Sequence, residues 1–311
     1  MPLGRNDVPQ AVQSELLKLW PAAAASVVPA EYRSIFQVIS DGRYQVVLAA
    51  MQAASRFTQF GSGEPVRNRD AFQSGSVTIT PVMLGEKVSF QFQTVEEVKA
   101  AIGTDLTQAV NTWALAQENT RDLQCTDMLK GTDTGYDGQA LFSSSHPQRS
   151  RFLDGSTFDN DDATAASLSH AVVRDLITLA EDTNAVNEAG DKMNRRVTHL
   201  VVTSMGQFLE LLPIIESPQR AGVANNDVNP LGRLGIVPML WRNLAGSTEY
   251  LYAFSNLPGQ TGLLYVNKQD TKIETQSNFD TKAIESTAHL QGAPAWTDWR
   301  CATRKALNAV A

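Results

Sequence analysis

The feature that most constrains this chain is one long helical pattern, which extends from Val95 to Lys130. Thr94 and Glu97 have the spacing of a capping box at its start, and Gly131 stands where a C-terminal cap is common. Apolar residues recur at the helical period between these two ends: Val95, Val98, Ile102, Leu106, Val110, Trp113, Ala116 and Leu123.

A continuous helix over this segment would be ~50 Å long, at 1.5 Å per residue. The average helix of a globular protein has only about 11–12 residues. Gly103 lies inside the pattern and costs about 1 kcal/mol relative to alanine, but it does not interrupt the period. The sequence therefore predicts a single spine helix over residues 95–130, with Trp113 and Met128 in the core.

Residues 41–92 have the pattern of an extended β-hairpin. Val77, Ile79 and Val82 alternate with polar residues, and the alternation returns over residues 88–92, as is typical of strands. A polar segment separates these residues from the mixed apolar stretch 44–60, and its notable members are Gly61, Gly63, Arg67, Arg69 and Asp70. An isolated hairpin with so little apolar surface is marginal in water. We therefore expect it to lie on a neighbour.

The remaining segments mix helices and strands without a regular βαβ repeat, which favours the α+β class. Residues 1–35 form a weakly patterned arm, in which Pro21 and Pro29 interrupt a short amphipathic stretch. Helices are predicted at 168–180 and 205–215. Strands are predicted at 198–203, 236–241, 249–254 and 263–266, and residues 282–304 alternate loosely.

Composition argues against several classes of protein. Lys and Arg total 26 against 33 Asp and Glu, a formal net charge of −7, whereas a dedicated nucleic-acid binder normally carries a basic domain or stripe. No apolar run approaches the ~18 residues of a membrane span, and no segment has a convincing signal-peptide pattern. Cys125 and Cys301 are far apart and fit free thiols in a reducing compartment. We expect a soluble globular protein made in the cytosol.

The sequence lacks the common motifs for catalysis, nucleotides and metals. His146 follows three serines, 143–145, which suggests a nucleophile and its base, but the members of a triad usually come from distant segments. The acidic run 159–162 could bind calcium, yet it lacks the glycine and the terminal glutamate of an EF-hand loop. We expect a solvated loop whose Asp162 caps the next helix. Arg195 and Arg196 are interpreted as a solvated face.

One short element is specific enough to suggest a family. Residues 136–147 resemble an element of Asp-Gly, Leu/Phe-Phe and His-Pro that is found in the major capsid proteins of tailed phages, in the Mu-like major head subunit group. The matching residues are Tyr136, Asp137, Gly138, Leu141, Phe142, His146 and Pro147. Segments 29–36, 229–238 and 295–300 resemble other parts of these proteins, so the resemblance covers essentially the whole chain.

The resemblance implies the Hong Kong 97-type capsid fold, which is α+β. Residues 1–40 would form an N-terminal arm, 41–92 the E-loop hairpin, and 93–197 a peripheral P-domain with the spine helix 95–130. Residues 198–285 would form the axial A-domain, and 286–311 a closing strand of the P-domain. The E-loop residues that would contact neighbouring subunits are Gly61, Gly63, Arg67, Arg69 and Asp70.

The implied function is structural: a major capsid protein that self-assembles into the hexamers and pentamers of an icosahedral shell around double-stranded DNA. The implied partners are further copies of the chain, a scaffolding protein, a portal and a decoration protein, with DNA contacted weakly and non-specifically. Assembly in the cytoplasm of a host bacterium would precede the virion, with no membrane, catalytic residue, cofactor or metal involved. Two alternatives stay open: an encapsulin-type nanocompartment shell, and a soluble hydrolase that depends on His146 or Asp137.

Overall fold

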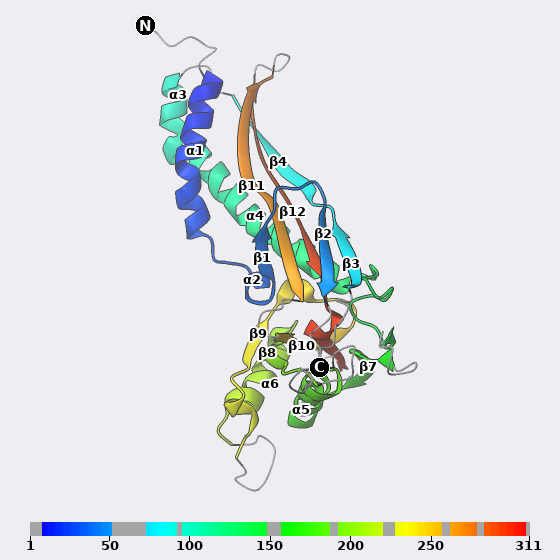
Figure 1. Ribbon diagram of the computed structural model, residues 1–311. Helices are drawn as coiled ribbons and strands as arrows, with labels where there is room; N and C mark the ends of the chain where they lie inside the picture. The colour runs from blue at the N-terminus through cyan, green and yellow to red at the C-terminus, as the bar shows by residue number, and fades with distance from the viewer. Residues whose placement is uncertain are drawn as a thin grey trace, which may run out of the picture.

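A computed structural model shows an elongated molecule made of two bodies (Figure 1). It describes residues 8–51, 73–91, 95–147, 157–186, 192–219, 228–256, 262–278 and 283–308. The upper body in Figure 1 is a long twisted sheet flanked by helices, and the lower body is compact and built on a second sheet. This mixture of helices and sheets agrees with the expected α+β class.

Four strands form the sheet of the elongated body, in the order β1-β11-β12-β4. They are β1 (Gln37–Ser40), β11 (Leu263–Ser277), β12 (Ile284–Trp296) and β4 (Val82–Phe90). β1 runs parallel to β11, and the other neighbours are antiparallel. The sequence predicted a strand only over 263–266, because the residues that follow are largely polar. Pairing with β12 extends β11 to 15 residues.

Helices α1 (Val8–Ser26) and α4 (Asp105–Lys130) pack along one face of this sheet (Figure 1). The larger buried side chains of this layer are Val8, Val12, Leu16, Phe90, Val98, Leu106, Val110, Trp113, Ile273 and Ile284. The expectation that Pro21 interrupts the N-terminal stretch is wrong, since α1 continues through it. Leu16 and Ala23 are buried on either side of the proline, so tertiary packing offsets its helix-breaking cost of about 3 kcal/mol.

The predicted spine helix is not continuous. α3 (Val95–Ala100) leads into a 3-10 turn (Ala101–Gly103), and α4 begins at Asp105. Thr104 lies between them with φ −128° and ψ −96°, outside the helical region. Thr94 of the expected capping box lies outside the described residues. The break follows Gly103, the residue that resists helical propagation most within this segment.

The base of the predicted hairpin is present. β2 (Val46–Met51) pairs antiparallel with β3 (Gln73–Ile79), and Val46 and Ile79 pack against Val266 and Ala295 of the long sheet. Tyr265, the preceding residue of β11, donates a hydrogen bond to Gln124 of α4, so the hairpin and the helices cover opposite faces of the sheet. The tip residues Gly61, Gly63, Arg67, Arg69 and Asp70 lie outside the described residues.

The compact body is a five-stranded sheet in the order β7-β13-β10-β8-β9. Its strands are β7 (Asp161–Ala166), β13 (Ala302–Leu307), β10 (Glu249–Asn256), β8 (Arg196–Val202) and β9 (Val237–Leu240). Helix α5 (His170–Thr178), which continues as a π turn (Leu179–Thr183), and α6 (Met205–Glu216) pack against it. The predicted helices at 168–180 and 205–215 and the strands at 198–203, 236–241 and 249–254 are confirmed within a few residues.

The C-terminal segment forms two strands, not the single closing strand expected over residues 286–311. β12 ends at Trp296, a 3-10 turn covers Trp299–Cys301, and β13 then enters the compact sheet. Asp298 caps this turn by accepting a hydrogen bond from the backbone N–H of Arg300 at 3.1 Å. The chain therefore crosses from one sheet to the other at Asp298.

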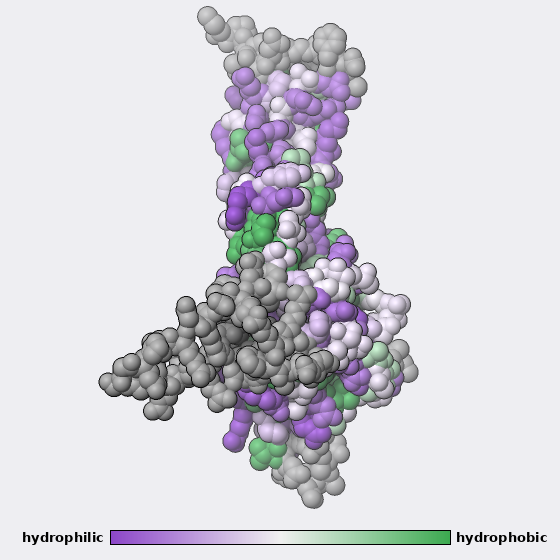
Figure 2. All heavy atoms as spheres, turned by 45° about the vertical axis from the view of Figure 1, so that its right-hand side comes forward, coloured by the Kyte–Doolittle hydropathy of each residue, from purple (hydrophilic) through white to green (hydrophobic). Residues whose placement is uncertain are grey.

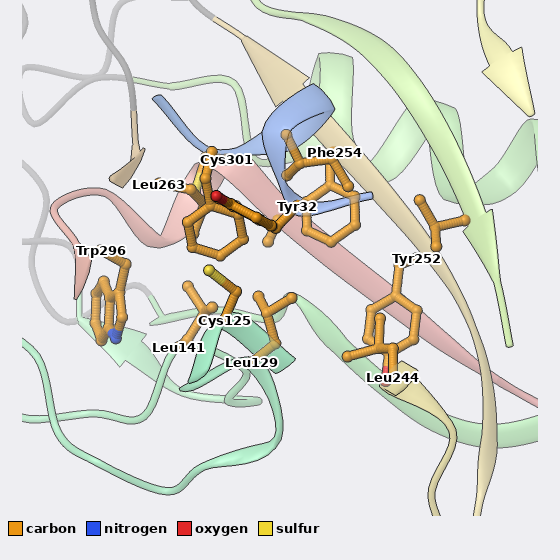
Figure 3. Close-up of a cluster of buried hydrophobic side chains, with 14 of the residues drawn as sticks. Tyr32, Cys125, Leu129, Leu141, Leu244, Tyr252, Phe254, Leu263, Trp296 and Cys301 are labelled. Atoms are coloured by element: carbon orange, nitrogen blue, oxygen red, sulfur yellow. The ribbon is translucent and has the colours of Figure 1, made fainter. Parts of the chain in front are cut away.

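A cluster of buried side chains joins the two bodies (Figure 3). It includes Tyr32 from the short helix α2 (Tyr32–Ile35), Leu129 from α4 and Tyr252 from β10. Other short elements border it: β5 (His146–Pro147), β6 (Thr157–Phe158), and the 3-10 turns Leu231–Arg233 and Arg242–Leu244. Because both bodies contribute side chains to one core, they pack as a unit.

Candidate functional site

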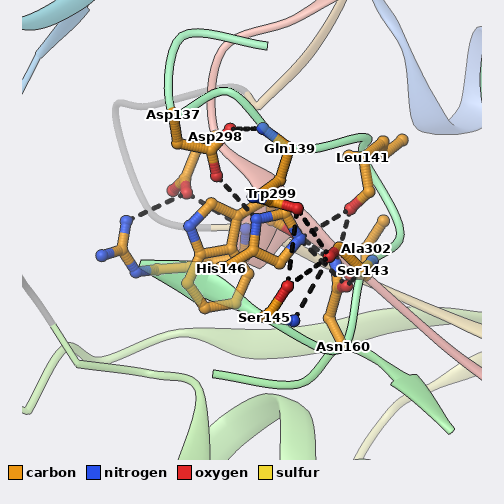
Figure 4. A network of polar contacts seen from close by, with 11 residues as sticks. Asp137, Gln139, Leu141, Ser143, Ser145, His146, Asn160, Asp298, Trp299 and Ala302 are labelled. Carbon is orange, nitrogen blue, oxygen red and sulfur yellow. Dashed lines mark hydrogen bonds and ion pairs between the residues drawn. The ribbon is translucent and has the colours of Figure 1, made fainter. Parts of the chain in front are cut away.

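Residues 136–147, which carry the family-like element, form a loop between the bodies whose buried side chains are Asp137, Leu141, Phe142 and His146 (Figure 4). Gly138 has a φ of +82°, a conformation that glycine adopts without strain, and the Gly138 N–H bonds the Gly135 carbonyl at 3.1 Å. Leu141 and Phe142 are buried in the cluster that joins the two bodies. The pattern of small turn residues and paired apolar residues thus anchors this loop in the core.

His146 is fully buried and has an acceptor at each ring nitrogen (Figure 4). Nδ1 lies 2.6 Å from Oδ2 of Asp137, and Nε2 lies 3.1 Å from Oδ1 of Asn160 and 3.2 Å from the Leu141 carbonyl. The ring stacks on Trp299 with centroids 4.4 Å apart and an interplanar angle of 4°. Both ring nitrogens of His146, and the ring face that lies on Trp299, are therefore taken up by contacts within the protein core.

Asn160 is the centre of this network. Its Nδ2 donates to the carbonyls of Leu141 at 2.8 Å and Ala302 at 2.9 Å, and its Oδ1 accepts from the Ser143 N–H at 2.9 Å. The carbonyls around Nδ2 fix the orientation of the amide. One side chain therefore holds the 141–146 loop against the start of β13. Sequence analysis missed Asn160 because it stands in a run of acidic residues.

A second polar group lies beside the first. Asp298 forms ion pairs with Arg195 and with Arg300, the latter at 3.2 Å. Burial raises the pKa of Asp298, but the positive charges of the two arginines outweigh it, and the pKa is held below its ordinary value. Arg195 is buried, so the expectation of a solvated face is wrong for it, whereas Arg196 is exposed.

A third group of charged side chains lies on the inward side of α4. Glu118 pairs with Arg33 of α2 at 2.5 Å, and Arg121 pairs with Asp270 of β11 at 3.0 Å. Asp122 accepts hydrogen bonds from Trp241 Nε1 at 3.0 Å. Residues 118, 121 and 122 are spaced so that they lie near one another on a helix, on the side expected to be apolar. That spacing was the sequence signal that could have revealed this charged group. In consequence, Leu123, expected on the buried face, is 45% exposed.

The arrangement around His146 does not suit nucleophilic catalysis. The Ser143 hydroxyl bonds Gln139 at 3.2 Å, and His146 directs its nitrogens at Asp137, Asn160 and a carbonyl. The His146 ring and the Asp137 carboxylate are buried in the core, so a substrate would have no access to them. The fold brings Asp137 and His146 together as members of a buried polar network that joins the two bodies.

The acidic run 159–162 is not a calcium loop. Arg304 forms a two-point ion pair with Asp161 at 2.6 and 2.7 Å, and Lys305 pairs with Asp162. The cap of α5 is Ser169, so the expectation that Asp162 caps this helix is wrong. Within the described ranges, no three His, Cys, Asp or Glu side chains are grouped to hold a metal ion.

Both cysteines, Cys125 and Cys301, are buried free thiols, as expected, and burial raises the pKa of each. Among the described helices, none combines the length and the hydropathy needed to cross a bilayer. Several large apolar side chains are nevertheless exposed, among them a group on α6 and β9.

Comparison with known proteins gives the fold. No protein-family model and no curated protein sequence matches the chain. A structure of Microbacterium phage Oxtober96 aligns with 91% of this chain and 92% of its own at a TM-score of 0.54 and 13% identity. The capsid of Myoviridae phage XM1 aligns over 89% and 91% at 0.52 and 11% identity. The procapsid of bacteriophage JBD30 aligns over 97% and 75% at 0.51 and 11% identity. The chain therefore has the fold found in these phage structures, two of which are a capsid and a procapsid.

Proposed function

We propose that this chain is the major capsid protein of a tailed phage, which assembles with its own copies into an icosahedral shell around double-stranded DNA. The observation that carries the proposal is the likeness to a phage capsid and a phage procapsid over at least 89% of the chain, at TM-scores above 0.5. The sealed core around His146 supports a structural role over a hydrolytic one, because it offers no path for a substrate. The element at 136–147, which resembles one of Mu-like capsid proteins, also supports a structural role, because Leu141 and Phe142 pack in the core that joins the two bodies.

The parts of such a subunit follow from the two bodies. We assign the N-terminal arm to residues 1–40 and the E-loop to 41–92. The elongated body, with α4 and the long sheet, fits the P-domain inferred for 93–197. The compact body fits the A-domain inferred for 198–285 only over 198–256, because β11 (Leu263–Ser277) and β12 belong to the sheet of the elongated body. β7, α5 and β13 also pack in the compact body, so the A-domain takes in 161–183 and 302–307 as well.

The hairpin supplies reach between subunits. Its base packs on its own sheet through Val46 and Ile79. We assign the contact with a neighbouring subunit to residues 61–70, from their sequence alone. Arg67, Arg69 and Asp70 would form ion pairs there, which set register more than affinity. Many such weak contacts, summed over a closed shell, give high stability without a tight dimer. Pentamers and hexamers of copies, a scaffolding protein, a portal and a decoration protein are the partners of this assembly, in a host cytoplasm and then in the virion.

DNA inside such a shell would be held weakly. The subunit has a formal charge of −7, and phosphate binding requires clustered Lys and Arg. The proposal is tested by electron microscopy and light scattering of the purified chain, alone and co-expressed with the neighbouring genes of its source genome. Shells with nuclease-protected DNA support a phage capsid. Shells that enclose protein cargo without DNA indicate a nanocompartment, and a chain that stays monomeric under all these conditions contradicts the proposal.

The hairpin is tested separately by the double variant Arg67→Glu, Arg69→Glu. We expect a folded subunit that no longer forms shells, because each of the two substitutions replaces a positive charge of a proposed intersubunit ion pair by a negative one. Arg174→Glu is the matched control, since Arg174 is an exposed arginine on α5 in the compact body. Normal shells from the double variant would exclude these arginines from the intersubunit contact.

A further inference from the structure

Helix α6 carries apolar side chains on both of its sides. Leu211, Ile214 and Ile215 are buried against the compact sheet. On the other side, Met205 is 48% exposed and Leu209, one turn later, is 62% exposed. The helix also carries the exposed Glu210 and Glu216, so its solvent side is mixed, with two large apolar side chains among charged ones. Met205 and Leu209 are therefore large apolar side chains of α6 that nothing in the described part of the subunit covers.

The exposed side of α6 continues into neighbouring elements. Leu234 follows the 3-10 turn 231–233 and Val237 opens β9, and both are about half exposed. α6 packs against this turn and against β9. We call Met205, Leu209, Leu234 and Val237 the α6–β9 patch. Figure 2 shows hydrophobic surface at the lower end of the compact body.

The patch borders an open sheet edge. β9 is the last strand of the five-stranded sheet and has β8 as its only partner there among the described strands. Pro238 removes one backbone N–H from this edge, which discourages pairing with another strand. Side-chain packing, not strand addition, is therefore the contact for which this edge is suited.

The patch is too small to hold a partner by itself, so it suits a partner that is bound through more than one contact. Four half-exposed side chains fall short of the ~800 Å² per partner of a standard stable interface. A second copy in a closed ring is held at two surfaces, so each contact can be small. A ring needs a different surface on the opposite side of the same body.

The opposite edge of the sheet offers such a surface. β7 lies at the far side of the compact body from β9 (Figure 1). Its residues Ala163, Thr164 and Ala165 are exposed, small and uncharged. The two aspartates that precede them, Asp161 and Asp162, form ion pairs with Arg304 and Lys305 of the same subunit. An apolar patch can therefore approach β7 without burying an unpaired charge.

We propose that the α6–β9 patch of one copy contacts the β7 edge of the next, in a head-to-tail contact that closes a ring of copies. This inference rests on the proposed shell function and names the surfaces through which compact bodies meet. Its test is a disulfide between copies. The native Cys125 and Cys301 are buried, so introduced cysteines are the thiols that oxidant reaches.

The chain carrying both Leu209→Cys and Ala165→Cys is oxidised under assembly conditions and run on a non-reducing gel. We expect a ladder of covalent oligomers that ends at the ring size. Either single variant should give no oligomers, and Leu209→Cys combined with Thr112→Cys, an exposed site on α4, is the matched control pair. Dimers from Leu209→Cys alone would show a two-fold contact and overturn the head-to-tail arrangement.

A second variant separates this contact from the shell itself. Leu209→Glu should keep the thermal stability of the subunit, since the side chain is mostly exposed, and should abolish particles, while Leu209→Met keeps them. Normal particles without a ladder, or normal particles from Leu209→Glu, overturn the contact alone. A wild-type chain that never assembles overturns the proposed function, and this inference with it.

Discussion

Replacing Asn160 by alanine tests whether the buried polar joint holds the two bodies together. Asn160 is fully buried, and its side chain makes five hydrogen bonds of 2.8 to 3.2 Å, to Leu141, Ala302, Trp299, Ser143 and His146. Each contributes about 1 kcal/mol net. Two N–H groups serve the three carbonyls, so Asn160→Ala should lower the free energy of unfolding by about 4–5 kcal/mol, a large share of the 5–15 kcal/mol typical of proteins.

The measurement is equilibrium unfolding in urea, followed by tryptophan fluorescence, with Ser145→Ala as the control. Ser145 is exposed and its hydroxyl makes only long contacts, so its loss should change stability by less than about 0.5 kcal/mol. Asn160→Asp keeps the volume but turns a carboxylate toward carbonyls, and should be at least as destabilising as alanine. A loss below about 1.5 kcal/mol in Asn160→Ala, at an unchanged m-value, would refute the reasoning.

Three further outcomes are expected. Asp298→Asn should cost about 2–3 kcal/mol at pH 7, because it removes the carboxylate charge that faces the buried Arg195 guanidinium; the native pKa lies below the ordinary 3.8, so the wild-type advantage should shrink as pH falls from about 4 and be lost below the native pKa, measured by urea unfolding against pH. Gly135→Ala should destabilise by about 1–3 kcal/mol, since its Cβ would lie 1.9 Å from the Trp296 ring, whereas Gly246→Ala, with its nearest atom at 3.8 Å, should be nearly neutral in thermal unfolding. Cys125 and Cys301 should resist a thiol reagent in the folded chain, because burial raises both pKa values, and both should react in urea; labelling of the native protein would contradict their burial.

The spacing of hydrophobic residues in the sequence was enough to predict the helices and strands that bury one face against a core. The helices at 168–180 and 205–215 follow from apolar residues at helical spacing, and the hairpin base follows from alternation around Val77 and Ile79. Their burial is decided locally, since a side chain's face depends only on its place in the period. The same pattern identified Trp113 as a core residue, which the structure confirms.

Other features arise only when distant segments meet. β11 extends past Val266 because β12 supplies its hydrogen bonds, which no local pattern records. α1 continues through Pro21 because α4 and the sheet bury residues on both sides of it. The segment 286–311 divides between two sheets because Asp298 caps a turn and pairs with Arg195, about a hundred residues away in sequence.

The element at 136–147 shows the boundary between the two kinds of information. Its sequence determined the turn at Gly138 and the apolar pair Leu141 and Phe142, and its resemblance pointed to a capsid fold. The roles of His146 and Asp137 were decided by tertiary structure, because Asn160 and Trp299 enclose them and leave no room for a substrate. Hydrogen bonds between distant residues have no sequence period, so only the folded chain shows that these groups hold two bodies together.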